Sequence, residues 1–312
     1  MEPPFFSIVI PTYNRAEYIN KAVQSLLSQT FSDFEIIIID DASTDDTEDI
    51  IQSYDDKRIV YIKNAANKER CISRNRGIEK ANGKYICFLD SDDYHLPNHL
   101  EKLYQLISSK NEPEAFFFSN AWDEDMTGNR AERACPDFEK FNAYTYYLHY
   151  TVNPQRWAVH HKVFEKIKFD PEIIICEDMD TSLRILAAGY PVYQLKELTT
   201  VYVAAEDSFT HSDTNKAEKE LLYLKKIFAK KELRGKLPII ERWRLLSMCH
   251  YHLAIKAFKS NSRYDTLKHA LKSFLFYPKG YNGKTNKTLL VMSIYAMPLF
   301  GKIVKFIISK LN

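Results

Sequence analysis

The sequence predicts an α/β fold, with a mostly parallel sheet flanked by helices and a helical extension at the C-terminus. Short apolar runs alternate with helical patterns over roughly the first ninety residues, which is typical of a doubly wound parallel sheet. Acidic residues follow two of the apolar runs. From about residue 216 onward the pattern is mostly helical and the charge is strongly basic.

The first part of the chain predicts a β-α-β-α-β-α-β order. Strands are expected at Phe6–Ile10, Phe34–Ile39, Ile59–Ile62 and Tyr85–Leu89. Between them, helices are expected around Ile19–Leu27, Thr47–Ser53 and Ile72–Ala81. The first helix has apolar residues at i, i+3, i+4, i+7 and i+8 from Ile19, the stripe of a helix with one buried face. In such sheets ligands bind at the carboxyl ends of the strands, where the acidic residues occur.

The remaining elements follow weaker signals. From about Ala121 to Gln155 the sequence indicates a loop-rich stretch. A helix is expected from near Asp178 to Gly189, a suitable C-terminal cap. The later expected elements are strands at Pro191–Leu195 and Thr199–Val203 and helices at Lys216–Lys231, Pro238–Ser260 and Arg263–Phe276.

Composition narrows the class of protein. The 312 residues are 45% hydrophobic and 27% charged, which is ordinary for a globular protein. The five cysteines lie far apart without a C-x-x-C pair, so we expect reduced thiols and neither a disulfide framework nor a zinc site. The N-terminal Met1–Pro4 has no basic or apolar signal region, and we therefore expect a cytoplasmic protein.

The charge divides the chain into two predicted domains, residues 1–214 and 215–312. The first contains 22 Lys and Arg against 36 Asp and Glu, and the second contains 21 against 5. The basic region predicts an anionic partner, for which we favour the inner membrane surface over nucleic acid, or else helices that pack on the acidic domain. The apolar run Leu289–Phe300 is too short to cross a bilayer, which needs about twenty residues. With Lys302 and Lys305 it suits either an interfacial anchor or a packed final helix.

The most informative motif is the acidic turn Asp90-Ser91-Asp92-Asp93 after the fourth expected strand. Three carboxylates in four positions repel one another unless a cation or ligand hydroxyls compensate the charge. Hard oxygen ligands suit Mg²⁺ or Mn²⁺, which usually bridges one or two carboxylates to substrate phosphates. The alternative is an acidic turn without a ligand.

Several segments carry a family resemblance in order and spacing. They are Pro11–Arg15, Asp40–Asp41, Ser73–Gly77, Ala81–Ile86, Leu89–Asp93 and Glu177–Asp178. Together they resemble the family 2 glycosyltransferases of bacterial polysaccharide biosynthesis, inverting enzymes of the Rossmann-like GT-A fold. The resemblance extends from about Phe6 to Val203.

The resemblance implies a role for each segment. The nucleotide-sugar would contact Pro11, Thr12, Tyr13, Asn14, Asp41, Arg74, Asp90 and Asp92. Asp41 would accept a hydrogen bond from the uracil N3–H, and Arg74 would bind the diphosphate or uridine. Asp92 would bind Mn²⁺ or Mg²⁺, with Asp93 as a supporting ligand. The alternatives are a helix cap for Asp40 and Asp41 and a surface charge for Arg74, with Arg70 or Arg76 in its place.

The resemblance also implies a catalytic base, Asp178, with Arg184 on the same helix orienting the acids. The alternative for Asp178 is an acidic N-cap. Relatives build the acceptor pocket near the positions of Trp157, His160 and His161, although a core position for Trp157 fits equally well. For His211 a surface loop is the better interpretation than a metal or phosphate contact.

The expected function is an inverting, metal-dependent hexosyltransferase. It would move a sugar from a nucleotide donor, expected to be a UDP-sugar, to a hydroxyl of a glycan or lipid-linked glycan. A dehydrogenase is excluded because no G-x-G-x-x-G occurs. The alternative is a catalytically inactive relative or a basic-tailed binding protein, and no nucleic-acid partner is expected.

Overall fold

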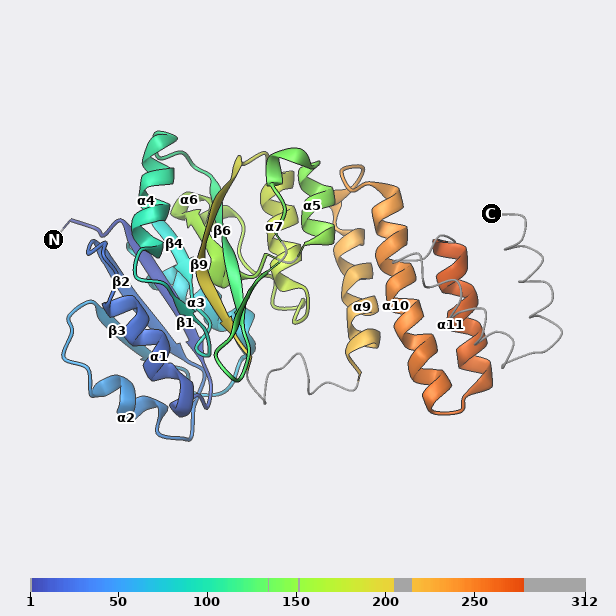
Figure 1. Ribbon diagram of the computed structural model, residues 1–312, viewed down its shortest axis with the longest axis horizontal. Helices are drawn as coiled ribbons and strands as arrows, with labels where there is room; N and C mark the ends of the chain where they lie inside the picture. The colour runs from blue at the N-terminus through green and yellow to red at the C-terminus, as the bar shows by residue number, and fades with distance from the viewer. Residues whose placement is uncertain (1, 134, 151, 205–214, 278–312) are drawn as a thin grey trace. The chain divides into compact units, whose positions relative to one another are not determined.

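A computed structural model describes residues 2–133, 135–150, 152–204 and 215–277. The chain divides into two compact units, Met1–Ser212 and Asp213–Asn312. The first unit combines one sheet with flanking helices, and the described part of the second unit is helical (Figure 1).

The elements of the first unit are as follows. The strands are β1 Phe6–Thr12, β2 Phe34–Asp40, β3 Ile59–Lys63, β4 Tyr85–Phe88, β5 Tyr94–His95, β6 Phe116–Glu124, β7 Arg130–Glu132, β8 Trp157–His160 and β9 Val192–Val203. The α-helices are α1 Ala16–Leu27, α2 Thr47–Gln52, α3 Glu69–Lys80, α4 His99–Ser109, α5 Ala143–His149, α6 His161–Lys166 and α7 Glu177–Ala187. Two 3₁₀ turns are η1 Phe138–Lys140 and η2 Pro154–Arg156.

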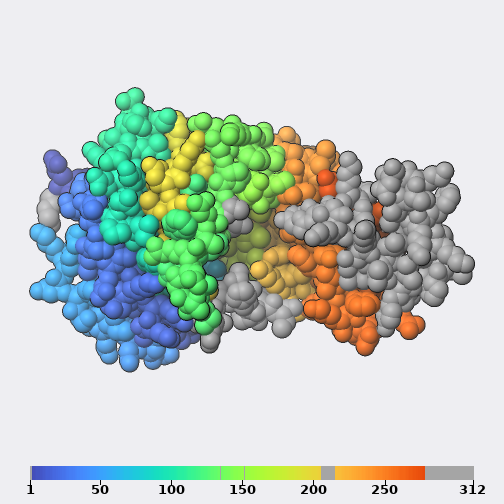
Figure 2. All heavy atoms as spheres, viewed as in Figure 1, coloured from blue at the N-terminus to red at the C-terminus, as the bar shows by residue number. Residues whose placement is uncertain are grey.

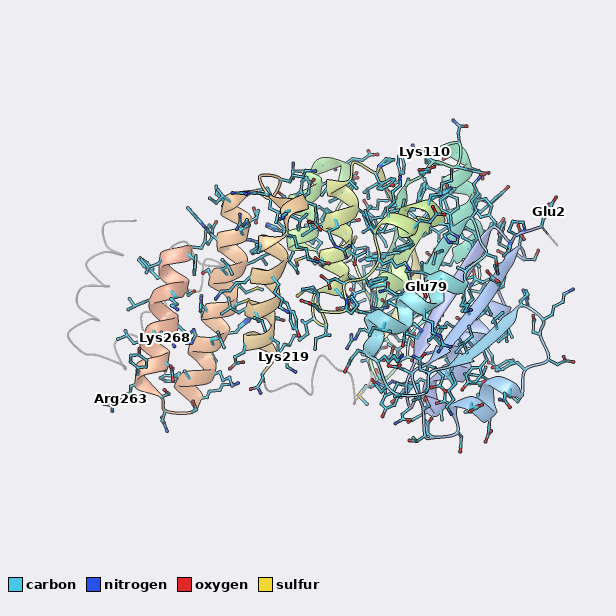
Figure 3. The ribbon with its side chains drawn as sticks, turned by 180° about the vertical axis from the view of Figure 1, so that it is seen from behind. Glu2, Glu79, Lys110, Lys219, Arg263 and Lys268 are labelled. Atoms are coloured by element: carbon cyan, nitrogen blue, oxygen red, sulfur yellow. The ribbon has the colours of Figure 1, made fainter. Side chains whose placement is uncertain are left out.

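The sheet has the strand order β3-β2-β1-β4-β8-β6-β9-β5, with β7 paired to β6. Strands β3, β2, β1 and β4 are parallel, whereas β8 is antiparallel to both of its neighbours and β6 is parallel to β9. Helix α1 lies on the face turned to the viewer in Figure 1, and α3, which contains the labelled Glu79, lies on the opposite face in Figure 3. The predicted α/β class is therefore confirmed. The second half of the sheet, from β8 to β5, contains both parallel and antiparallel strand pairs.

Strand β1 continues through Pro11 to Thr12, two residues beyond the expected end. Pro11 has no N–H to donate, so it is tolerated only where a neighbouring strand needs none. The paired part of β4 ends at Phe88 opposite Val9, which leaves the β4 side of Pro11 without a ladder partner. On the other side β1 stays paired with β2 as far as Thr12 and Asp40.

Helix α3 packs unusually close to the sheet at Gly77. A Cβ on this glycine would lie 2.2 Å from Val9 Cγ1, far inside van der Waals contact. Only glycine therefore allows this approach between helix and strand. The close packing holds Arg74, one turn earlier on α3, near the carboxyl ends of β1 and β4.

The stretch from Ala121 to Gln155 is more ordered than its sequence indicates. It contains the last four residues of the nine-residue strand β6, all of β7 and helix α5, where a loop-rich segment was expected. The helix is short and rich in tyrosine, a residue of modest helix propensity, so local signals are weak. Its Tyr147 is buried and stacks on Phe116 of β6 at 5.8 Å, a tertiary contact that stabilises the helix.

Other differences lie nearby. Elements β5 and α4 between Asp93 and Ala121 have no counterpart among the expected ones. The two short strands expected at Pro191–Leu195 and Thr199–Val203 form the single strand β9, with register shifts against β6 around Asn120.

The three helices expected in the C-terminal region are confirmed as α9 Lys216–Ala229, α10 Ile239–Lys259 and α11 Arg263–Phe276. Basic side chains of these helices, among them Lys219, Arg263 and Lys268, are labelled in Figure 3. No helix among residues 2–277, the masked positions apart, is long and apolar enough to span a membrane. The expected apolar run Leu289–Phe300 and the lysines after it lie outside the described residues.

Candidate active site

A cleft of about 730 Å³ lies at the carboxyl ends of the parallel strands in the first unit. Because β2, β1 and β4 are adjacent and parallel, the segments that follow them meet at one edge of the sheet. Most of the expected nucleotide-sugar and metal residues line this cleft, namely Pro11, Thr12, Tyr13, Asp41, Arg74, Asp90, Asp92 and Asp93. Asn14 and Asp178 are not among the lining residues.

Thr12 and Tyr13 differ in what they offer to a ligand. Thr12 is 3% exposed, and its Oγ1 has no hydrogen-bond partner among the described residues. Such a buried hydroxyl costs free energy unless a ligand or water pairs with it. Tyr13 is 45% exposed, which leaves its ring available for a planar group such as a base.

Asn14 connects two loops. Its backbone N–H donates to Ser43 Oγ at 2.9 Å, and its Oδ1 accepts from the Thr44 N–H at 2.8 Å. Its φ of 50° is in the left-handed region, which asparagine tolerates better than most residues. Asn14 thus joins the loop after β1 to the loop after β2, and its contacts are with protein.

The two aspartates after β2 have different environments. Asp40 is fully buried and accepts hydrogen bonds from the Ser43 N–H and the Tyr61 hydroxyl, so it holds its own loop. Asp41 lines the cleft, and its Oδ1 accepts from Asn64 Nδ2 at 2.6 Å. The Lys68 N–H also donates to Asp41. These contacts orient the Asp41 carboxylate and leave it lone pairs for a ligand.

Arg74 is not a surface charge. Its side chain is 2% exposed, and it donates from Nη2 to Asp90 Oδ1 at 2.8 Å and from Nη1 to Glu177 Oε1 at 3.0 Å. The guanidinium therefore joins the acidic turn after β4 to the first residue of α7. Its Nε has no partner among the described residues, which leaves one donor for a ligand.

The carboxylates of the acidic turn are used differently. Both oxygens of Asp93 accept hydrogen bonds, from Gln155 Nε2 at 2.6 Å and from the Val203 N–H at 2.9 Å. Burial raises the pKa of Asp93 well above its usual value, and the charges of Asp92 and Asp90 add to the rise. Asp93 therefore braces the turn, whereas Asp92 is partly exposed to the cleft.

The donor set fits a divalent ion that is held mainly by its substrate. Within the described residues, no three His, Cys, Asp or Glu side chains converge to hold a metal by themselves. Asp92 offers hard carboxylate oxygens in the cleft, and only one oxygen of Asp90 pairs with Arg74. Mg²⁺ and Mn²⁺ accept such a site when phosphate oxygens and water complete their coordination.

Asp178 lies in the first turn of α7, and the N-cap of that helix is Cys176. The side chain is 8% exposed and accepts from the Met179 N–H at 2.7 Å. Burial raises the pKa of the Asp178 carboxyl to about 7, and the Glu177 carboxylate adds to this rise. The Met179 hydrogen bond and the charge of Arg74 oppose it. The result is a carboxyl that changes protonation near neutral pH, as a general base requires.

Other expected residues lie away from the cleft lining. Arg184 pairs with the fully buried Asp180 at 2.8 Å, so the acid that it orients is Asp180. Trp157 is fully buried and stacks on Phe169, which makes it a core residue. His160 packs edge-on against Tyr85 at the amino end of β4. His211 lies outside the described residues.

Several cleft residues had no role in the sequence analysis, among them Asn153, Gln155 and Tyr202. Asn153 and Gln155 flank Pro154 at η2, and Tyr202 is near the end of β9. No local motif marks them, because they come together only when β8, β6 and β9 are in place. Glu124 at the end of β6 pairs with Lys21 of α1 at 3.1 Å. In Figure 2, green atoms of the middle of the chain lie beside the blue atoms of its N-terminal part.

The chain is similar in sequence to known glycosyltransferases. Residues 7–168 match the model of glycosyl transferase family 2. An uncharacterised glycosyltransferase of Methanocaldococcus jannaschii is 34% identical over 209 residues, which cover 65% of this chain and 71% of the relative. A UDP-Glc:alpha-D-GlcNAc-diphosphoundecaprenol beta-1,3-glucosyltransferase, WfaP of Escherichia coli, is 44% identical over 118 residues, or 38% of this chain and 46% of the relative.

A solved structure shares the fold. It is S. aureus TarS 1-349 in complex with UDP-GlcNAc, with a TM-score of 0.66 and 18% identity. The match covers 93% of this chain and 91% of the TarS chain. The predicted GT-A fold class, with its C-terminal helices, is thereby confirmed.

We predict that Arg74→Met will lower the free energy of unfolding by about 3–5 kcal/mol, because it removes the buried partner of Glu177 and leaves that carboxylate only the longer 3.8 Å contact with Arg70 Nη1. The matched control is Lys168→Met, which removes the exposed pair between Lys168 and Glu79 and should cost about 1 kcal/mol or less. Chemical denaturation measures both variants. Equal, small losses would contradict a stabilising role for the buried pair.

Proposed function

The chain belongs to glycosyl transferase family 2, and from that premise we propose an inverting, metal-dependent transfer of a sugar from a UDP-sugar to a hydroxyl of a lipid-linked glycan. The observation that carries the proposal is the buried Arg74, which pairs with Asp90 in the cleft and with Glu177 beside Asp178. It connects the candidate diphosphate site with the candidate base.

The proposed donor is supported from two sides. In the cleft, Asp41 offers an oriented carboxylate to a base with an N–H, and Tyr13 offers an exposed ring. Among similar proteins, TarS is solved with UDP-GlcNAc, and the glucosyltransferase WfaP is named for UDP-Glc. WfaP is also named for a diphosphoundecaprenol-linked acceptor, which supports a lipid-linked acceptor for this chain.

In the proposed mechanism, Arg74 and Asp90 position the diphosphate and ribose, and Asp178 removes the proton from the acceptor hydroxyl. The hydroxyl oxygen then bonds to the anomeric carbon while the bond from that carbon to the diphosphate oxygen breaks on the opposite face. UDP leaves with the bonding electrons, and the proton remains on Asp178. A Mg²⁺ or Mn²⁺ ion held by Asp92 would supply Lewis-acid stabilisation of the charge on the leaving diphosphate.

We also propose that the protein binds an anionic membrane surface. Residues 215–312 contain 21 Lys and Arg against 5 Asp and Glu, and anionic lipid attracts such segments. In the described part of this unit, Ile239, Ile240 and Trp243 are 56%, 57% and 46% exposed near the start of α10. Exposed apolar side chains on a basic helical unit are typical of interfacial contact.

We predict a pH dependence for transfer. Because the base acts in its deprotonated form and burial raises the pKa of Asp178 to about 7, kcat should fall below pH 7, by about tenfold for each further pH unit. Asp178→Asn should still bind UDP but transfer almost no sugar. Steady-state rates from pH 5 to 8 measure this, with UDP affinity over the same range as the control. A turnover in Asp178→Asn like that of the wild type would exclude Asp178 as the base.

We predict that Asp92→Asn will lose metal-dependent donor binding while the fold survives. Thermal unfolding with UDP, UDP-sugars and GDP-sugars, each with and without Mn²⁺, reports binding as a rise in melting temperature. The wild type should be protected by UDP-sugars with Mn²⁺, and the variant should show little protection at the same concentrations. If UDP-sugars protect the wild type equally with and without Mn²⁺, the proposed metal dependence is excluded. If only GDP-sugars protect it, a UDP-sugar is excluded as the donor.

We predict binding of the full chain to vesicles that contain phosphatidylglycerol, with weaker binding as salt rises. Ile240→Glu should weaken the binding about tenfold or more, because an exposed apolar side chain that would be buried in the lipid is replaced by a charged one. The matched control, Met126→Glu, changes an exposed apolar residue of the first unit and should bind like the wild type. Vesicle pelleting measures both. Binding to DNA but not to vesicles would contradict the proposal.

A further inference from the structure

Three buried polar side-chain atoms of the cleft lining have no hydrogen-bond partner within the described part of the chain. Among the residues that the structure describes, Asn153 Oδ1, Gln155 Oε1 and Tyr202 OH have no hydrogen-bond partner, and all three residues line the cleft. Buried polar groups are nearly always paired in folded proteins, by protein, water or ligand. Three such atoms in one cleft therefore indicate a place where a polar ligand binds.

Gln155 is held rigidly. The residue is 2% exposed, and its Nε2 donates to Asp93 Oδ2 at 2.6 Å. Its backbone carbonyl accepts from His95 Nε2 at 2.8 Å. With the amide nitrogen committed to a carboxylate, the unpaired Oε1 is a fixed hydrogen-bond acceptor in the cleft.

Asp93 places this acceptor next to the candidate diphosphate site. One oxygen of Asp93 binds Gln155, and the other accepts from the Val203 N–H, whose neighbour is Tyr202. Asp93 directly follows Asp92, the candidate metal ligand. The unpaired atoms of Gln155 and Tyr202 thus lie around the acidic turn, on the side of β8, β6 and β9, away from the nucleotide residues after β1 and β2.

The chemistry of the three atoms selects a class of ligand. Two are amide carbonyl oxygens, which accept hydrogen bonds, and the third is a phenol, which both donates and accepts. Burial raises the pKa of Tyr202, so the phenol stays neutral and keeps its proton. The Arg133 guanidinium lies 3.9 Å from the centre of the Tyr202 ring and pairs with Asp123, which holds the ring in place.

We infer that Asn153, Gln155 and Tyr202 bind hydroxyl groups of the sugar that the nucleotide donor carries, and thereby determine which donor sugar is accepted. The inference rests on the proposed function, since it assigns the sugar subsite of the same cleft. A site that pairs buried polar atoms with substrate hydroxyls rejects sugars whose hydroxyls point elsewhere, because the protein atoms then stay unpaired.

The test compares UDP with UDP-sugars in the full-length protein. Isothermal titration calorimetry with Mn²⁺ gives the affinities of the wild type for UDP, UDP-glucose, UDP-galactose and UDP-GlcNAc, and the tightest UDP-sugar is then used with the variants. Tyr202→Phe removes one hydroxyl and no hydrogen bond within the described residues. It should weaken UDP-sugar binding by about five- to a hundredfold and UDP binding by less than about twofold.

A matched control separates recognition from stability. Tyr147 also has a buried hydroxyl without a partner among the described residues, but it packs on Phe116 and does not line the cleft. Tyr147→Phe should change neither affinity. Gln155→Leu, with its melting temperature measured in parallel, should repeat the selective loss of UDP-sugar affinity.

The outcomes are distinct. Equal losses of UDP and UDP-sugar affinity in Tyr202→Phe would overturn the inference, since the residue would then act on the nucleotide or the fold. Unchanged UDP-sugar affinity with a higher KM for the acceptor would also overturn it and assign these residues to the acceptor. If the wild type binds UDP but binds no UDP-sugar more tightly than UDP, the proposed sugar subsite is refuted and the proposed function is not. A wild type that binds neither UDP nor any UDP-sugar would refute the proposed function itself.

Discussion

The arrangement of the candidate site depends on one buried guanidinium. Arg74 pairs with Asp90 from the turn after β4 and with Glu177 from the start of α7. Without this cation, two carboxylates from distant parts of the chain would face each other in a poorly solvated place and repel. Arg74 reaches this position because Gly77 lets α3 pack directly on Val9 of β1.

The acidic residues at the carboxyl edge of the sheet differ in role because their burial and hydrogen bonds differ. Asp40 and Asp93 are buried and have both oxygens hydrogen-bonded, so they hold loops. Asp41 and Asp92 line the cleft. Asp178 is buried beside Glu177, and its raised pKa suits proton transfer. Burial and hydrogen bonding thus give some of these aspartates a structural role and make others suitable for ligand binding or proton transfer.

The two halves of the sheet contribute differently to the cleft. The parallel half supplies the residues expected to bind the nucleotide and diphosphate, from loops after β1, β2 and β4. The mixed half supplies Asn153, Gln155 and Tyr202, whose unpaired atoms suit a sugar.

The sequence by itself determined the α/β class, the first four strands, the three C-terminal helices and the positions of the cleft residues from Pro11 to Asp93. These features follow from local signals, since strand and helix periodicity and acidic residues at strand ends are visible within short windows. Tertiary structure alone decided that β8 runs antiparallel to β4, that α5 forms around Tyr147, and that Arg74 is a buried ion-pair partner. It also decided that Asp93 braces the turn and that Gln155 and Tyr202 meet in the cleft. These outcomes depend on contacts between residues far apart in the chain, whose energies no local pattern contains.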